Sequence, residues 1–518
     1  MKNKKENLSW LWRNAEKVLI VTFFLTFTLN IRKVFLTPYS FLNGGFNEYM
    51  TMSFSWADAL MIGTIIIYNI KLIISQFRQA KTTGALLENV IRNKSSVIRN
   101  YYNDNVSRET FYLLIFLGWV GLSIFWSQYR PIAVYRLLTF VEIALFAYIA
   151  VKSLNQQKWV KLAFSAIILN GLFQSLLGIA QFVHNGSLKL HLLGESIIGP
   201  NIDGAAKIII GGEKHIRAYG TLPHPNILAG FLLIPLFIII SEFFQQKFLP
   251  TSSLSSSLQT NRDPLPTEKA ETRMACENVP HETFLGFIPR WALFIILLTT
   301  GSGFLLTFSR SAFLGFFIGF SIFLAWDSYL QSSSRILKSN FKFFISLIIA
   351  LLLITILLLA NTSFFSNQSL QERTLFQNVS YETILKHPFT GVGIGQFVAS
   401  EYQIHPNLEN WQYQPVHNIY LLAFSELGTI GLIFFLLWIF SILEWGSSKN
   451  RNTGLLRSLL LTRLSIYCIV LSFLFIPFLD HYFWDIKLGT IIFVLPIIFI
   501  LALAMDSKRC STYFLGLL

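Results

Sequence analysis

The stretch QPVHNIYLLAFSELGTIG, residues 414–431, is the most informative for the fold. In it the chain changes from a polar segment to a long apolar run, and a histidine stands at the change. His417 ends a polar segment, and after Ile430 the chain continues as LIFFLLWIFSIL, which is apolar enough to lie in a membrane. An ionisable side chain at such a boundary costs free energy to keep and therefore indicates a functional residue. The structural alternative is a histidine that only ends a helix at the interface.

The composition indicates a membrane protein. Of 518 residues, 53% are hydrophobic and 13% are charged, which predicts an all-α polytopic membrane protein. The net charge of +14 comes from short basic tracts between apolar runs, where such tracts fix topology, so we expect no nucleic-acid partner. The three cysteines lack C-x-x-C spacing and predict neither a metal site nor a disulfide framework.

The apolar runs predict about twelve transmembrane helices, since each crossing needs about 20 residues. The predicted spans are residues 18–36, 54–75, 111–127, 132–152, 159–183, 226–246, 289–308, 311–327, 341–360, 417–443, 461–479 and 487–505.

The Lys and Arg residues beside these spans predict that both termini are cytoplasmic, because basic residues are retained on that side. No cleavage site follows the first apolar run, so we expect it to be retained. Residues 1–518 then form a single integral membrane domain with two larger extracytoplasmic loops, 184–225 and 361–416. Residues 247–288, which include a Ser run, predict a flexible cytoplasmic linker.

The outer loop 361–416 contains a predicted amphipathic helix over Arg373–Lys386, since its apolar residues recur at roughly helical spacing. The glycine-rich HPFTGVGIGQF that follows predicts a tight turn near the membrane surface. A nucleotide site is disfavoured there, because no strand precedes the glycines.

Two arginines stand at the outer ends of predicted spans. Arg217 precedes the span that begins at residue 226, and Arg310 lies between two apolar runs with almost no loop. A guanidinium at the bilayer edge needs an anion or must extend to water, and its fork can bind phosphate oxygens in pairs. Lipid headgroups and a substrate phosphate are both suitable partners.

Two further polar groups lie on the same side. His224, Pro225 and Asn226 open a predicted helix, where free N–H groups favour an anion, although helix capping alone explains the triplet. Asp480 and His481 form a polar turn able to orient a catalytic neighbour, with an interfacial aromatic belt as the alternative.

Three ionisable residues inside the predicted spans stand apart and are given only a packing role. They are Asp58, Arg136 and Glu142. By contrast, one histidine and two arginines from three separate spans converge on one membrane face. That pattern suits an anionic, membrane-held substrate and a nucleophile that needs a base.

These residues lie in stretches that resemble the O-antigen ligase and O-antigen polymerase superfamily of bacterial membrane glycosyltransferases. The stretches are RAYGTLPHPNILAGF (217–231), FSRSAFLG (308–315), KHPFTGVGIGQF (386–397) and HNIYLLAFSELGTIG (417–431). The last is similar to the ligase pattern at His417, Asn418, Gly428 and Gly431. The resemblance covers about residues 190–440, which we take as an O-antigen ligase-like core.

The resemblance implies a glycan donor on undecaprenyl pyrophosphate, a glycan or lipid acceptor, and a site on the outer face of the inner membrane. It also implies catalysis without a metal or other cofactor. By position, Arg217 and Arg310 would bind the pyrophosphate and His417 would take the acceptor proton. The supporting residues would be His224, Asn226, Asn418, Asp480 and His481.

Three functions remain open. The leading expectation is a ligase-like enzyme that transfers the glycan to a terminal acceptor hydroxyl, such as lipid A core. A surface polysaccharide polymerase of the same fold would join repeat units on the carrier. A lipid-linked sugar transporter or flippase is disfavoured, because its ionisable residues should lie near the bilayer midplane and the candidates here cluster at one edge.

Overall fold

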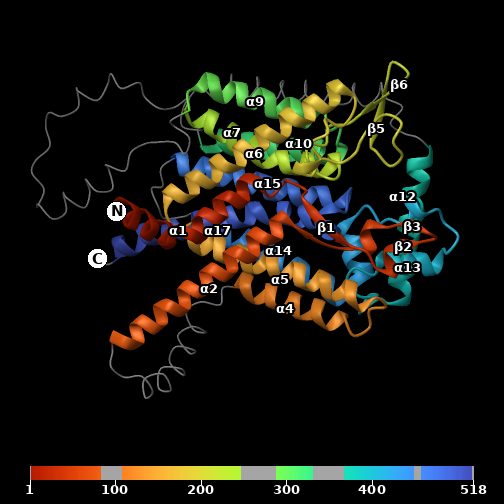
Figure 1. Cartoon of the computed structure of the whole chain (residues 1–518), viewed down its shortest axis with the longest axis horizontal. Coiled ribbons are helices and arrows are strands. Elements are labelled where there is room, and N and C mark those ends of the chain that lie inside the picture. Colours follow the sequence, from red (N-terminus) through yellow and green to blue (C-terminus); the bar gives the residue numbers. More distant parts are fainter. Residues whose placement is uncertain (1, 83–107, 247–287, 331–366, 449–456, 516–518) are drawn as a thin grey trace, which may run out of the picture.

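The computed structural model describes residues 2–82, 108–246, 288–330, 367–448 and 457–515. It is mostly helical, and the long helices lie side by side (Figure 1). The helices are α1 (Lys2–Thr26), α2 (Trp56–Thr82), α4 (Arg108–Ser123), α5 (Arg130–Ser153), α6 (Gln157–His184), α7 (Pro225–Gln246), α9 (Arg290–Leu305), α10 (Arg310–Leu330), α12 (Asn367–Lys386), α13 (Phe397–Ile404), α14 (Ile419–Ser448), α15 (Arg457–Phe475), α16 (Tyr482–Asp485) and α17 (Lys487–Leu515).

Within the described residues, six helical segments are long and apolar enough to cross a membrane. They are Trp56–Phe77, Arg130–Ser153, Gln157–His184, Pro225–Gln246, Ile419–Glu444 and Leu461–Phe478. Three shorter apolar helices are Arg290–Leu305, Arg310–Trp326 and Lys487–Leu503. The count of twelve therefore stays a prediction. The predicted span 341–360 and almost all of the predicted linker 247–288 lie outside the described residues.

The chain is mostly helical, as expected, and within the described residues three two-stranded antiparallel hairpins that the sequence analysis did not predict extend from the helices. Their strands are β1 (Arg32–Phe35) with β4 (Met52–Ser55), β2 (Phe41–Leu42) with β3 (Gly45–Phe46), and β5 (Lys207–Ile210) with β6 (Glu213–Ile216). The predicted span 18–36 is correspondingly wrong at its end, since α1 stops at Thr26 and β1 starts at Arg32.

Two-residue turns explain two of these hairpins. Asn43 and Gly44 connect β2 to β3 with φ of 48° and 77°, and Gly211 and Gly212 connect β5 to β6 with φ of 58° and 89°. Positive φ at both central residues is the type I′ geometry, whose twist matches that of antiparallel strands. The polar loops thus fold back locally instead of extending the neighbouring helices.

Helix α7 lies at the centre of one part of the bundle and packs against α6, α9, α10, α15 and α17. Its side chains from Ile227 to Ile240 are almost all buried, which explains why its sequence is apolar on every face. The N-terminal end of this helix carries His224, Pro225 and Asn226. A rigid, buried helix therefore positions three of the residues singled out in the sequence.

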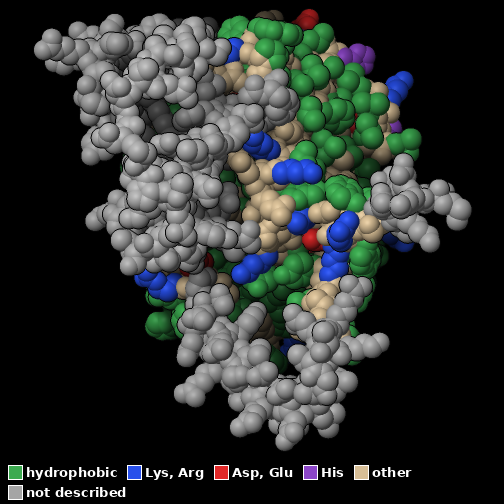
Figure 2. Space-filling view, turned by 90° about the vertical axis from the view of Figure 1, so that its left-hand side faces the viewer, with side chains coloured by type: hydrophobic (Ala, Val, Ile, Leu, Met, Phe, Trp, Pro, Cys, Tyr) green, Lys and Arg blue, Asp and Glu red, His purple; other side chains and the backbone are tan. Residues whose placement is uncertain are grey.

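The bundle has two different ends (Figure 1). Both chain termini lie at one end, which we call the termini end, and the hairpins lie with α12 and α13 at the opposite, hairpin end. The end-on view in Figure 2 shows several Lys and Arg side chains on the termini end, with few acidic ones in sight. Lys17 of α1 and Lys158 of α6 lie over the ring of Trp159.

Candidate functional site

His417 lies at the hairpin end, two residues before α14 begins. This helix is broken at Gly428, whose φ of 68° and ψ of −174° are not helical. A side chain there would collide with the Phe389 backbone, since a Cβ atom would lie 2.2 Å from its carbonyl carbon. The break therefore requires glycine, and it separates the segment that carries His417 from the rest of α14.

The glycine-rich turn predicted after α12 supplies the hydrogen bonds that α14 lacks at this break. The amides of Val392 and Gly393 donate to the Ser425 and Glu426 carbonyls over 3.0 and 2.8 Å. In return, the Thr429 amide donates to the Pro388 carbonyl over 2.9 Å. An unpaired backbone group in a membrane costs several kcal/mol, so the two quoted stretches 386–397 and 417–431 stabilise each other.

A chain of hydrogen bonds starts at Arg217. Its Nε donates to the Thr307 carbonyl and its Nη2 to Asn226 Oδ1, both over 2.6 Å. Asn226 Nδ2 in turn donates to Asp480 Oδ2 over 2.6 Å. Three segments distant in sequence are thereby joined, and the guanidinium is held in one orientation.

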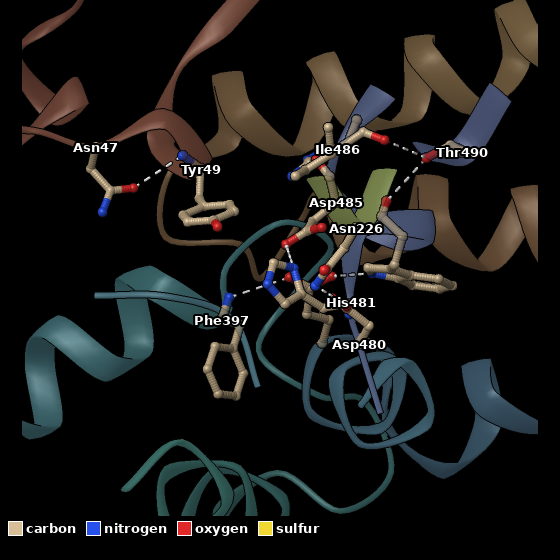
Figure 3. A network of polar contacts seen from close by, with 12 residues as sticks. Asn47, Tyr49, Asn226, Phe397, Asp480, His481, Asp485, Ile486 and Thr490 are labelled. Atoms are coloured by element: carbon tan, nitrogen blue, oxygen red, sulfur yellow. Dashed lines mark hydrogen bonds and ion pairs between the residues drawn. The ribbon is translucent and has the colours of Figure 1, made fainter. Parts of the chain in front are cut away.

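The chain continues from Asp480 to a buried histidine and aspartate pair (Figure 3). The His481 amide donates to Asp480 Oδ1 over 2.9 Å, and His481 Nδ1 lies 2.8 Å from Asp485 Oδ2. Asp480, His481 and Asp485 are only 4%, 5% and 8% exposed, and we call them the buried layer. Burial disfavours the charged form of His481, but Asp485 and Asp480 outweigh it and raise the pKa of this imidazole.

The His417 ring packs edge-on against the His481 ring, with 4.7 Å between ring centroids, and is stacked on Phe376 of α12. Its Nδ1 has no hydrogen-bond partner among the described residues. Burial, and then the nearby His481, Arg373 and His224, lower the pKa of His417 well below its ordinary value. The imidazole is therefore neutral at neutral pH and can accept a proton.

His224 is also neutral, because burial, Arg217 and His481 lower its pKa to about 3. Its Nδ1 accordingly accepts a hydrogen bond from the Asn226 amide over 3.1 Å. Arg217 stays charged, since burial lowers its pKa only to about 10. The site thus combines neutral imidazoles with a cation at neutral pH.

Arg310 is the first residue of α10 and follows the turn whose Thr307 carbonyl binds Arg217. The next residue, Ser311, lies 3.5 Å from Asp480 through its hydroxyl. The charge of Arg310 also contributes to the lowered pKa of Arg217, which shows that the two cations are electrostatic neighbours. The free amides at a helix N-terminus add to the attraction for an anion.

The predicted site residues therefore gather at one end. The half-buried outer layer comprises Arg217, His224, Asn226, Arg310 and His417, and it contacts the buried layer through Asn226 and His417. Asn418 stays at the edge, where its side chain caps α14 by accepting from the Leu421 amide over 3.1 Å. Reactive groups are thus reachable from outside, while the carboxylates beneath them are shielded.

Three contributors were not singled out in the sequence. Asp485 was detectable, since Asp or Glu four residues after a histidine can meet it across one helical turn. Tyr49, whose ring lies 5.7 Å from the His481 ring, belongs to the short 3-10 turn η2 (Glu48–Met50), and no sequence pattern singled it out. Arg373 lies on the predicted amphipathic helix, and its charge acts on His417, Asp480 and Arg310.

Two of the three ionisable residues inside the spans, Asp58 and Arg136, are not isolated, contrary to expectation. Asp58 forms an ion pair with Lys487 at 3.0 Å and accepts a hydrogen bond from the Ser55 amide. Arg136 donates to the backbone carbonyl of Asp485. Their partners come from segments distant in sequence, so residue spacing along one helix could not predict these contacts.

Comparison with known proteins adds one finding to this geometry. Residues 293–436 match the family model described as O-antigen ligase. No curated protein gives a significant match. The matched region contains Arg310, the glycine-rich turn and His417, and ends in the second part of α14. This match over residues 293–436 confirms the resemblance to the O-antigen ligase superfamily that was drawn from the sequence and, together with the apolar helices, supports a membrane protein of polysaccharide biosynthesis.

Proposed function

We propose that the chain transfers a glycan from undecaprenyl pyrophosphate to an acceptor hydroxyl on the outer face of the inner membrane. The observation that carries this proposal is the continuous set of contacts from Arg217 through Asn226 and Asp480 to His481, against which His417 packs. It joins a cation able to bind a diphosphate to an imidazole able to take a proton. The family match supports glycosyl transfer of the O-antigen ligase type.

Arg217 and Arg310 would bind the donor pyrophosphate. The hydrogen bonds to Thr307 and Asn226 hold the Arg217 fork before the substrate arrives, so little reorganisation is needed when negative charge develops. Arg310 adds a second cation and the N-terminus of α10. Stabilisation by a single preorganised donor is commonly worth about 3–4 kcal/mol of activation free energy.

His417 would act as the general base. The acceptor oxygen forms a bond to the anomeric carbon, the bond from that carbon to the pyrophosphate oxygen breaks, and the acceptor proton moves to His417. The electron pair of the broken bond leaves on undecaprenyl pyrophosphate. Attack opposite the leaving group inverts the anomeric centre. The neutral state of His417 supports this role, because a protonated imidazole has no lone pair to offer.

The buried layer would hold the imidazole of His417 in position. His481 is held by Asp485 and presents its ring to His417, while Asp480 is tied to Asn226. The carboxylates act through His481, because Asp485 and Asp480 hold the ring against which His417 packs and so fix the position of the base. Asp480 and Asp485 thus assist the proton transfer without contacting the donor phosphate.

The test is to incubate purified chain with lipid-linked oligosaccharide and candidate acceptors, and to identify the product by mass. A glycan attached to lipid A core or another terminal acceptor supports the ligase, whereas longer chains on the carrier identify the polymerase. Wild-type transfer by a His417→Ala variant would remove the base assignment. Movement of the unaltered donor across a vesicle membrane, with no new glycosidic bond, would point to the transporter instead.

A further inference from the structure

A polar cavity of about 60 Å³ lies beside the buried layer, on the side of His481 where Tyr49 packs. One wall is the β1–β4 hairpin with the η2 turn (Glu48–Met50), and the other is formed by the second and third turns of α5 and the first turn of α17. None of the roles proposed above uses this space. It has room for about four waters at roughly 15 Å³ each, or for one edge of a small polar ring.

The strand register shows how the hairpin forms this wall. Arg32 pairs with Ser55 and Val34 with Ser53, and all four residues line the cavity. Lys33 and Phe54, which form the intervening pair, do not line it, and Phe54 is 44% exposed. Since side chains alternate between the two faces of a strand, one face of the hairpin belongs to the cavity and the other faces outward.

The lining has the chemistry of a carbohydrate site. Hydroxyl groups come from Thr51, Ser53, Tyr135 and Thr139, and aromatic rings from Tyr49 and Tyr135. Hydroxyls donate and accept hydrogen bonds, and aromatic rings cover the apolar face of a sugar. A second cavity, between α14, α15 and α17, is lined only by apolar residues such as Ile439, Val470 and Phe493. The two cavities therefore differ in chemistry, and only the one beside the buried layer offers hydrogen-bonding groups to a ligand.

Each charged group of the lining already has a partner, which for Arg136 is the backbone carbonyl of Asp485, so a neutral ligand suffices. Arg32 pairs with Glu48 at the rim, and Lys487 pairs with Asp58 while lying 4.9 Å from the centre of the Tyr135 ring. A ligand with no net charge at its inserted edge leaves these ion pairs intact. A phosphate would have to displace Glu48 from Arg32, Asp58 from Lys487 or the Asp485 carbonyl from Arg136.

Asp485 connects the cavity to the proposed chemistry. Its Oδ2 lies on His481, and its Oδ1 is buried without a hydrogen-bond partner among the described residues, although the residue lines a polar cavity. A buried carboxylate oxygen left unpaired is costly, and a hydroxyl donor would form a short, strong hydrogen bond with it. The atom therefore fits a sugar hydroxyl as its partner.

We infer that this cavity binds the hydroxyl-bearing edge of one sugar residue, which donates to Asp485 Oδ1 and packs on Tyr49 and Tyr135. The inference deepens the proposed function and rests on it for the source of the sugar, which belongs either to the donor glycan or to the acceptor. In both cases the sugar is held next to His481 and so fixes the distance between the glycan and the base.

The experiment measures binding without turnover. Full-length chain carrying His417→Ala, in detergent, is titrated with two probes followed by saturation-transfer NMR: the oligosaccharide released from the lipid-linked donor, and the core oligosaccharide of the acceptor. Ser53→Leu fills the cavity and should weaken binding of one probe at least about 10-fold. Tyr135→Phe keeps the ring, removes one hydroxyl and should weaken it about 2- to 10-fold, so the test does not depend on the larger substitution folding.

Matched controls lie on the outward face of the same hairpin. Lys33→Gln and Phe54→Leu should leave binding of both probes unchanged. The probe that responds to Ser53→Leu identifies the source of the sugar. Equal binding by all four variants, or no binding of either probe, would overturn the inference. Saturable binding that depends on Ser53, together with no glycan transfer by the chain that retains His417, would keep the cavity and remove the proposed function. Transfer by the chain that retains His417, if unchanged by Ser53→Leu, would keep the proposed function and remove the cavity.

Discussion

The two ends of the bundle use basic residues in opposite ways. At the termini end, Lys17 and Lys158 lie over the Trp159 ring, and Lys158 is exposed. At the hairpin end, Arg217 donates hydrogen bonds to the Thr307 backbone carbonyl and to the Asn226 side chain. Asn226 in turn contacts Asp480, which is shielded from solvent. The first arrangement suits a membrane surface, where a cation needs only water and an interfacial ring.

The second arrangement has a different physical meaning. Fixing a guanidinium in place costs free energy, because the side chain loses conformational freedom and hydration. Binding of an anionic ligand can offset this cost. The number of cations at one end of the bundle therefore does not indicate function. What distinguishes the two ends is that Arg217 is fixed by hydrogen bonds, whereas Lys158 is exposed to solvent. Substitutions at the two ends should therefore differ in effect, and the following predictions run from the largest expected effect to the smallest.

His417→Ala should reduce the transfer rate by about 10²- to 10⁴-fold, the usual contribution of a general base. Membrane insertion should be unchanged, because α14 is attached through backbone hydrogen bonds at residues 425–429. The measurement is transfer from lipid-linked oligosaccharide per mole of folded protein. The matched control is His184→Ala at the exposed end of α6. A loss of equal size in both variants would contradict a specific role for His417.

Arg217→Ala and Arg310→Ala should each lower transfer by about 10²- to 10³-fold, since each removes a preorganised donor from the developing diphosphate charge. Arg310→Lys should recover only part of the activity, because a point charge cannot reproduce the planar fork. The same assay applies, with Lys158→Ala at the termini end as the control. If Lys158→Ala lost as much activity as Arg217→Ala, a specific role for the basic residues at the hairpin end would be contradicted.

The acid limb of the pH–rate profile should lie below pH 6.5, because the base must be neutral and the pKa of His417 is lowered. His481→Gln removes one of the positive neighbours that lower it, so the limb should move to higher pH. Burial, Arg373 and His224 still act on His417 in this variant, which keeps the limb below pH 6.5. A limb that stays in place or moves to lower pH would show that His481 does not act on the base electrostatically.

The smallest expected effect is that of a chelator. Transfer should be unchanged in excess EDTA, since the two guanidiniums supply the charge stabilisation that a divalent cation would otherwise provide. The measurement is the initial rate before and after dialysis against chelator. A loss that Mg²⁺ or Mn²⁺ restores would show that the cations at the hairpin end are insufficient by themselves.

Much of the helical architecture was predictable from the sequence, because apolar runs of sufficient length have few other solutions. The starts of α7 and α14 next to His224 and His417 follow from the change from polar to apolar residues. The hairpins were missed, although Asn43-Gly44 and Gly211-Gly212 are strong two-residue turn signals. Attention to long apolar runs favoured a continuous helix over 18–36, where the chain instead turns into β1.

The candidate site was predictable in its members and not in its connections. Arg217, Arg310, His417, Asp480 and His481 stand out by type and position, but nothing along the chain says that Asn226 bridges Arg217 and Asp480. The break at Gly428 was equally hidden. A positive φ inside a helix becomes favourable only when another segment supplies the missing hydrogen bonds, and that segment is distant in the sequence.

The docking of residues 388–393 onto α14 relies on peptide groups, which every residue type possesses. Side chains at Thr390 and Val392 can therefore change while the backbone contacts that position the His417 segment are kept. Proline is the exception, because at 392 or 393 it would delete a donor to α14. A saturation scan of 386–397 should accordingly tolerate most side chains at 390 and 392 and reject proline.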